Sequence, residues 1–362
     1  MTDMITLDLL PTLALGATIL GTGGGGDPYV GRLMAEQAIR ECGPVPLVAP
    51  EDVPDDAVLL LCGMMGAPAV IVEKLPSGTE IAQAITAVAQ MTGRAVTHLV
   101  SLEAGGINSV VPVAAAARTG LPLVDADGMG RAFPELQMLL PTLEGISATP
   151  MALVDDKGNR LVIDTVHNRS AEAFARGATV QMGASASLAF YPLRGDQVAR
   201  ALVPRTMSLA IAIGRALETA RRAHDDPIDA VARAMQGRAL FTGKVVDVLR
   251  RTTAGFNRGV ATIEGMGSDI GTVMTLDFQN EFLIARRGDR PVVTTPDLIC
   301  LLDTLSGEPV TAETLRYGRR VAVIGAPCFE RWRSPEGLAI VGPGYFGYGF
   351  PYRPFSPDDE SV

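Results

Sequence analysis

Cysteine and histidine are scarce in this chain of 362 residues, and their scarcity excludes several kinds of site. The four cysteines, Cys42, Cys62, Cys300 and Cys328, show no CxxC spacing, so a disulfide framework is not predicted and reduced thiols are expected. The three histidines show neither an HxH nor an HExxH pattern. No zinc site is therefore predicted from the sequence.

Positive charge and long apolar runs are also lacking. The chain has 31 basic and 40 acidic residues, a net charge of −9, which argues against binding to a nucleic-acid backbone. The strongest apolar run, residues 57–72, is interrupted by Gly63, Gly66 and Pro68, whereas a spanning helix needs about 20 predominantly apolar residues. No basic region precedes an apolar stretch near Met1. We expect a cytoplasmic protein that binds neither nucleic acid nor membrane.

Hydrophobic residues make up 47% of the chain, enough for a large core, and the length suggests two domains. In residues 1–166, short apolar runs alternate with helix-like segments, which predicts an α/β domain with a mainly parallel sheet. Residues 167–350 begin with helical patterns and continue with closely spaced β-type runs, which predicts an α+β domain with a mostly antiparallel sheet or barrel. The proline-containing segment 351–362 is expected to be a flexible tail.

The expected elements follow from these patterns. Strands are predicted at 45–48, 57–62, 96–102 and 121–124, a hairpin at 151–166, and further strands at 243–249, 259–263, 271–277, 281–286, 291–294 and 320–324. Helices are predicted at 6–20, 28–42, 79–91, 108–118, 208–222 and 228–235.

The most unusual string is Leu20-Gly-Thr-Gly-Gly-Gly-Gly-Asp-Pro. Consecutive glycines allow positive φ and bring backbone N–H groups close to a ligand, while Asp27 and Pro28 suit the start of a helix. A substrate carboxylate, phosphate or carbonyl would fit there, so the candidate ligand contacts are Gly23, Gly24, Gly25, Gly26 and Asp27. A purely structural turn remains an alternative. A dinucleotide site fits less well, because the preceding segment is helical and no Lys-Ser/Thr follows.

Three carboxylates follow predicted neighbouring strands. Glu103 comes after the strand at 96–102, and Asp125 and Asp127 come after the strand at 121–124, so all three are expected at one edge of the sheet. Together with Asn108 they would hold a divalent metal or provide a general base of raised pKa, because like charges held together disfavour joint ionisation. The alternative is that Asp-x-Asp-Gly is only a turn.

The second half offers Asn280, Glu281 and Tyr345 as substrate contacts from the opposite side. We expect the site to lie between the two domains, where ligand sites are favoured. Ion pairing on a sheet surface, core packing of the tyrosine, and use of the second domain for assembly are the alternatives.

Several of these strings occur together in a known family. They are Leu20-Gly-Thr-Gly-Gly-Gly-Gly-Asp-Pro, Glu103-Ala-Gly-Gly-Ile-Asn, Val124-Asp-Ala-Asp-Gly-Met-Gly-Arg-Ala-Phe-Pro-Glu, Asn280-Glu, Pro296-Asp-Leu-Ile and Leu315-Arg-Tyr-Gly. Over nearly its whole length the chain resembles the bacterial S-methyl thiohydantoin desulfurase family. The resemblance implies cytosolic handling of hydantoin-like five-membered rings, with relatives beside or fused to hydantoinase/oxoprolinase-type enzymes.

We therefore expect a hydrolytic enzyme acting on a small cyclic amide or thioamide of the hydantoin or thiohydantoin type. Asp125, Asp127 or Glu103 would activate water, directly or through a divalent metal. The alternative is a non-catalytic ligand-binding or accessory subunit of a hydantoinase/oxoprolinase-type partner. In either case we expect a homo-oligomer.

Overall fold

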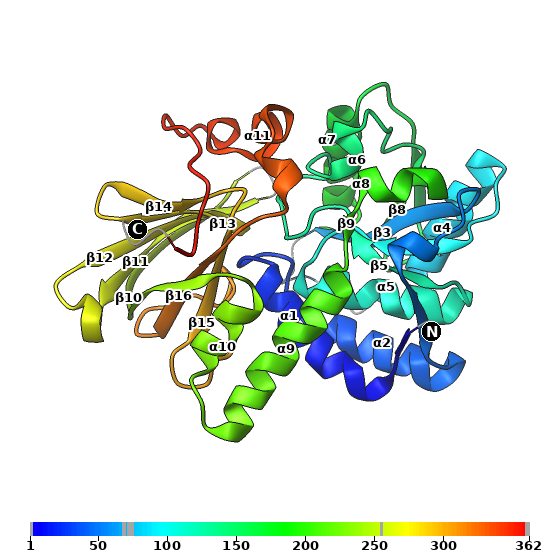
Figure 1. Ribbon diagram of the computed structural model, residues 1–362. Helices are drawn as coiled ribbons and strands as arrows, with labels where there is room; N and C mark the ends of the chain where they lie inside the picture. The colour runs from blue at the N-terminus through cyan, green and yellow to red at the C-terminus, as the bar shows by residue number, and fades with distance from the viewer. Residues whose placement is uncertain (1–2, 67–69, 71–75, 254–255, 359–362) are drawn as a thin grey trace.

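The computed structural model describes residues 3–66, 70, 76–253 and 256–358. These residues form two sheets, which we call sheet A and sheet B, lying on the right and left of Figure 1. Sheet A has nine strands in the described residues and sheet B has seven.

The centre of sheet A is parallel, as the alternating pattern predicts. Its strands lie in the order β2 (Val45–Val48), β5 (Leu123–Asp127), β4 (His98–Ser101) and β3 (Val58–Gly66). Their apolar residues are almost all buried because helices cover both faces. Antiparallel strands extend this centre: β1 (Asp3–Ile5), β6 (Met151–Val154), β7 (Arg160–Ile163), β8 (Ser185–Arg194) and β9 (Val203–Pro204).

The long helices pack on sheet A and between the two sheets. They are α1 (Leu10–Leu20), α2 (Pro28–Cys42), α4 (Glu80–Thr92), α5 (Gly106–Thr119), α7 (Asn168–Gln181), α9 (Thr206–Ala223) and α10 (Pro227–Ala234), with short α6 (Leu140–Leu143), α8 (Val198–Ala201) and α11 (Pro335–Val341). Helices α1 and α9 approach each other so closely that a Cβ added at Gly16 would lie 1.8 Å from Ala210 O, and one added at Gly214 would lie 2.1 Å from Thr12 O. Only glycine permits this crossing.

Sheet B is antiparallel throughout and curves into a half-barrel. Its order is β14 (Arg290–Thr294), β13 (Glu281–Arg287), β12 (Val273–Gln279), β11 (Phe256–Gly265), β10 (Arg238–Thr253), β16 (Arg320–Ala326) and β15 (Leu298–Asp303). Phe241, Phe278 and Phe282 belong to its own core. Cys300 on β15 instead packs into the core of the other sheet, where its Sγ lies 3.1 Å from Ile19 O.

The expected fold class is confirmed: a sheet with a parallel centre and covering helices, followed by an antiparallel sheet. Strand β3 continues past the predicted end at Cys62 because β8 pairs with it as far as Gly66. Strand β5 continues to Asp127 because β9 pairs with its last residues, so Asp125 and Asp127 lie on the strand and do not follow it. Elements α7, β8 and β15 were not predicted.

The described part of the tail is anchored to sheet B. The Phe355 N–H and the Tyr352 hydroxyl each donate to Asp297 Oδ2 at 2.8 Å, and Phe355 is buried. Residues 359–362 of the tail, and 67–69 and 71–72 of the apolar run at 57–72, lie outside the described residues. Nowhere in the described chain is there a helix with the length and apolar character needed to cross a bilayer.

Candidate functional site

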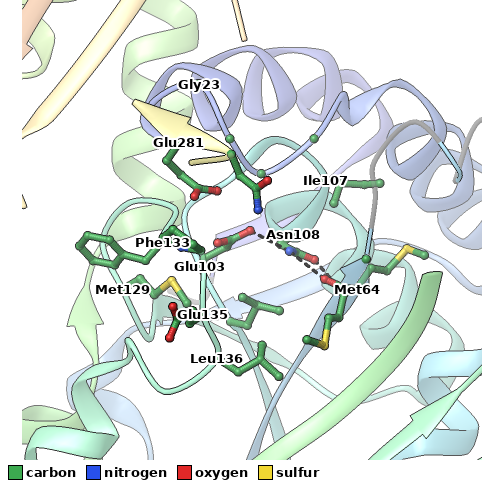
Figure 2. Close-up of a pocket in the computed structure, with 18 of the residues that line it drawn as sticks. Gly23, Met64, Glu103, Ile107, Asn108, Met129, Phe133, Glu135, Leu136 and Glu281 are labelled. Carbon is green, nitrogen blue, oxygen red and sulfur yellow. Dashed lines mark hydrogen bonds between the residues drawn. The ribbon is translucent and has the colours of Figure 1, made fainter. Parts of the chain in front are cut away.

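A cavity lies where the two sheets meet, and both halves of the chain line it (Figure 2). The first half contributes the glycine loop, the end of β3, the β4–α5 connection and the segment after β5. The second half contributes α7, the start of β13 and the β15–β16 connection. The lining residues include Gly23, Gly24, Gly25, Gly26, Met64, Glu103, Ile107, Asn108, Met129, Phe133, Glu135, Leu136, Arg176, Asn280, Glu281, Thr311 and Glu313.

The glycine loop is packed tightly on both sides. Gly25 has a φ of +70°, its carbonyl accepts from Ile107 N at 2.8 Å, and an added Cβ would lie 2.7 Å from Gly105 Cα. On the other side, a Cβ at Gly23 would meet the Phe282 ring at 2.3 Å. The glycines therefore let the start of α5 and the start of β13 meet at the cavity, and they also line it.

Glu103 lies between β4 and α5, almost fully buried. Asn108 Nδ2 donates to Glu103 Oε1 at 2.8 Å, and Asn108 Oδ1 accepts from Met64 N at 2.7 Å, so Asn108 clamps the carboxyl group to β3. Burial raises the pKa of Glu103 to about 7, against the opposing hydrogen bond from Asn108, and the nearby Asp127 raises it further. A carboxyl group in this range exchanges protons readily at neutral pH.

Glu281 is the first residue of β13 and is only 3% exposed. Its side chain lies against Gly24, and its Oε2 atom has no hydrogen-bond partner among the described residues. Burial, followed by the neighbouring Glu103, raises the pKa of Glu281 well above its ordinary value. Figure 2 shows the carboxyl groups of Glu103 and Glu281 pointing into the same cavity. We call them the carboxyl pair; at neutral pH such a pair favours one proton and one negative charge.

Asp125 and Asp127 do not join this pair. Asp125 accepts from Ser208 N at 3.0 Å and from Ser208 Oγ at 2.6 Å, which ties it to the first turn of α9. Asp127 Oδ1 accepts from Met129 N and Gly130 N, each at 2.5 Å, so it stabilises the turn after β5. Neither residue lines the cavity, because β9 and α9 cover this part of β5. The expected convergence of Glu103, Asp125 and Asp127 in one cleft is therefore not formed.

Of the other residues predicted for the site, some line the cavity and others lie outside it. Asn280 lines the cavity beside Glu281, whereas Asp27 caps α2 by accepting from Tyr29 N at 2.9 Å. Tyr345 lies outside the cavity, and its hydroxyl donates to Glu135 Oε2 at 2.7 Å. Among the described residues, no three His, Cys, Asp or Glu side chains are grouped to hold a metal ion. A divalent metal thus has no ready ligand set in the described part of the chain.

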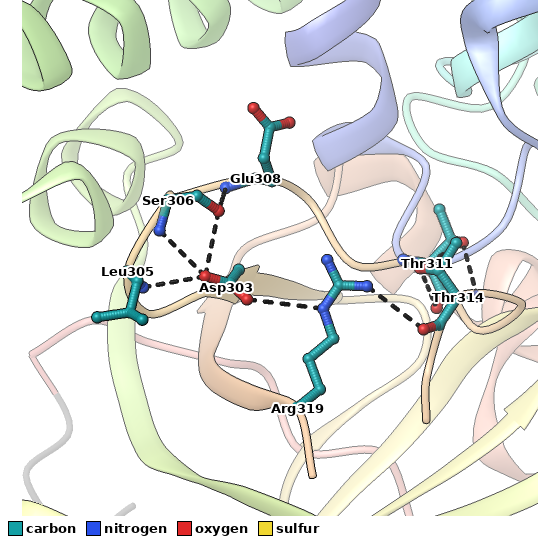
Figure 3. Close-up of polar contacts among 7 residues, drawn as sticks. All are labelled: Asp303, Leu305, Ser306, Glu308, Thr311, Thr314 and Arg319. Carbon is teal, nitrogen blue, oxygen red and sulfur yellow. Dashed lines mark hydrogen bonds and ion pairs between the residues drawn. The ribbon is translucent and has the colours of Figure 1, made fainter. Parts of the chain in front are cut away.

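The connection between β15 and β16, residues 304–319, supplies part of the cavity wall, which the sequence did not predict. Figure 3 shows polar contacts that hold this connection. Asp303 Oδ1 accepts from Leu305 N and Ser306 N at 3.0 Å, and Arg319 lies 3.7 Å from Asp303 Oδ2. Within the connection, Ala312 N donates to Gly23 O at 2.8 Å. Thr311 and Glu313 are thereby held against the glycine loop.

Other lining residues form an apolar wall of the cavity. Met64, Met129, Phe133 and Leu136 come from the end of β3 and the segment after β5. Apolar residues in core-like positions carry no sequence signal that separates a cavity wall from ordinary packing. Arg176 was missed because α7 itself was not predicted.

Comparison with known proteins agrees with this two-part construction. The family model "S-Me-THD-like, N-terminal domain" matches residues 8–165, and "S-Me-THD-like, C-terminal domain" matches residues 166–355. The chain belongs to the S-Me-THD-like family. Within it, Glu103 and the glycine loop lie in the N-terminal match and Glu281 in the C-terminal match, so the cavity forms where the two family domains meet.

Among solved structures, the chain is similar to the crystal structure of a protein from Chromobacterium violaceum. The two share 25% sequence identity with a TM-score of 0.82, over 98% of this chain and 100% of the other. No curated protein matches the chain.

Proposed function

We propose that this chain is a hydrolase acting on a small five-membered ring of the S-methyl thiohydantoin or hydantoin type. The observation that carries the proposal is the buried carboxyl pair, Glu103 and Glu281, in a cavity shared by the two domains. The family name points to thiohydantoin-related activity.

The size and lining of the cavity fit such a ring. The cavity has a volume of about 90 Å³. This is several times the roughly 10–15 Å³ that one water needs, so a small five-membered ring has room there. The apolar wall of Met64, Met129, Phe133 and Leu136 suits a methylthio group, while the glycine loop beside the N-terminus of α5 suits a ring carbonyl oxygen.

In the proposed reaction the two carboxyl groups exchange protons with water and the ring. Ionised Glu103, positioned by Asn108, takes a proton from water while the water oxygen attacks the ring carbon that bears sulfur. The electrons of the carbon–nitrogen double bond move to nitrogen, which takes the proton of Glu281. The carbon–sulfur bond then breaks, methanethiol leaves with the proton from Glu103, and the new hydroxyl returns its proton to Glu281 as the carbonyl forms.

The test is turnover of an S-methyl thiohydantoin and a hydantoin, followed by methanethiol release and ring-product chromatography. We expect wild-type turnover and a loss of roughly a hundredfold or more in Glu103→Gln, as for removal of a general base. Asp125→Asn is the matched control, since Asp125 is buried but does not line the cavity. Ring binding without turnover would favour the accessory-subunit alternative, and absence of both binding and turnover would contradict the proposal. Turnover that survives dialysis against a chelator would show that no divalent metal is needed.

A further inference from the structure

Arg131 is a buried cation that stands behind the cavity wall. It is 1% exposed, does not line the cavity, and stacks over the Phe133 ring at 4.7 Å from the centroid. Its guanidinium reaches from the segment after β5 to the backbone of the second half. It donates to Phe282 O at 3.1 Å and to Asp297 O at 2.8 Å. Phe282 directly follows Glu281, so Arg131 holds the backbone one residue beyond this member of the carboxyl pair.

The hydrogen bonds of Arg131 leave its charge unbalanced. Its acceptors are backbone carbonyl oxygens, which carry no formal charge. The carboxylate of Asp297 is itself engaged by Arg333 at 2.9 Å and by the Tyr352 hydroxyl. Burial lowers the pKa of Arg131 to about 10, and Glu281 is the strongest of the groups that oppose this shift. A buried cation is tolerated when an opposite charge compensates it, and in the described part of the chain Glu281 compensates Arg131 most strongly, with a smaller effect from Asp297.

We propose that Arg131 is a positioning residue of the active site, which fixes the backbone carbonyl of Phe282, next to Glu281, and balances the single negative charge of the carboxyl pair. Its catalytic consequence rests on the function proposed above. Other charged groups also face the pair: Asp127 acts on Glu103, Arg176 acts on Glu281, and Glu135 and Glu313 share the cavity. Arg131 differs from Arg176 in having carbonyl groups as its acceptors, whereas Arg176 is already paired with Glu172.

The experiment compares the wild type with Arg131→Met and Arg131→Lys by two measurements. Carbon-13 NMR of labelled glutamate carboxyl groups follows the ionisation of the pair without substrate, with Glu103→Gln and Glu281→Gln providing the assignments. Turnover is measured from pH 5.5 to 9. In Arg131→Met we expect ionisation of the pair to move to higher pH, and turnover at pH 6 to fall by roughly tenfold or more relative to pH 8.5. Arg131→Lys keeps the charge, so it should restore the pH dependence while losing part of the maximal rate.

Arg331→Met is the matched control, because Arg331 also joins the two halves, through its ion pair with Glu144, but does not line the cavity. It should leave both pH curves unchanged. Unchanged carboxyl titration in a folded Arg131→Met would overturn the proposal. If the methionine variant does not fold, Arg131→Gln, which also removes the charge but keeps hydrogen-bond donors, is measured by the same criterion. If the wild type turns over no ring substrate while the titration shifts as expected, only the proposed function fails.

Discussion

At Glu103, burial and hydrogen bonding act in opposite directions on one proton, and burial is the stronger. The pKa of Glu103 rises from 4.5 to about 7 in the folded chain, so the native state binds more protons than the unfolded state between these values. This contribution to stability is fully present below pH 4.5 and is lost as the pH rises through 7. As the pH rises from 5 to 8, we expect the free energy of unfolding, measured with urea, to fall less in Glu103→Gln than in the wild type. An equal loss in both proteins would show that Glu103 does not titrate in this range.

Asp125 is expected to matter for stability and not for turnover. Its buried carboxylate accepts two hydrogen bonds from the half-buried Ser208 in the first turn of α9. We predict that Asp125→Ala lowers the free energy of unfolding by about 2–4 kcal/mol, because two partly buried donors lose a charged acceptor. The rate per folded molecule should stay within about twofold of the wild type. A large loss of rate in a protein of unchanged stability would instead return Asp125 to the catalytic machinery.

These residues also show what the sequence alone predicts about the site. The Gly-rich string, Glu103, Asn108, Asn280 and Glu281 were singled out by residue type and by position at element ends, and the structure brings them to one cavity. Spacing also placed Asp125 and Asp127 on one side of a strand. It did not predict that β9 and α9, about 80 residues later, would cover them. Such long-range pairing depends on the tertiary fold, which local patterns do not encode.

At the level of the element, the glycine loop is expected to position the carboxyl pair. An added Cβ at Gly24 would lie 2.1 Å from Glu281 Oε1, so Gly24→Val must displace that flexible side chain. We predict a loss of turnover of roughly a hundredfold with a small change in stability, because Gly24 does not require a positive φ. Gly177→Ala in α7 is the control: no atom lies within 4 Å of an added Cβ, so it should be neutral or slightly stabilising in thermal unfolding. Normal turnover in Gly24→Val would mean that the loop serves packing alone.

Whole elements were predicted best where a local signal was strong. Asp27 and Pro28 marked the start of α2, and apolar runs between turn signals marked β2 and the β6–β7 hairpin. The ends of β3 and β5 were placed too early because partners distant in the chain extend them. Helix α7 was not predicted, although its alanines favour a helix. It is held in place by contacts such as the one in which Glu172 Oε2 accepts from Leu136 N at 2.9 Å.

At the scale of the whole molecule, the two halves share one core. Strand β8 pairs with β3 and β6, and α9 packs against α1, so elements after residue 165 complete the first sheet and its helical layer. Buried residues of β15 and β16, including Cys300 and Ile324, belong to the same cluster as α1. The cavity therefore lies between two halves of the chain that bury their apolar side chains against each other.

A fragment of residues 1–165 is accordingly predicted not to fold by itself. Without β8, the edge of β3 would expose unpaired backbone groups, and without α9, the close-packing face of α1 around Gly16 would be exposed to water. We expect the fragment to show no cooperative thermal transition by circular dichroism, and the full chain to unfold in a single transition by calorimetry. A mixture of this fragment with a fragment of residues 166–362 should show a helical circular-dichroism signal that is absent without either piece. A fragment that unfolds cooperatively alone, or a full chain with two separated transitions, would show that the first half is an autonomous domain and that the cavity forms by docking of two finished units.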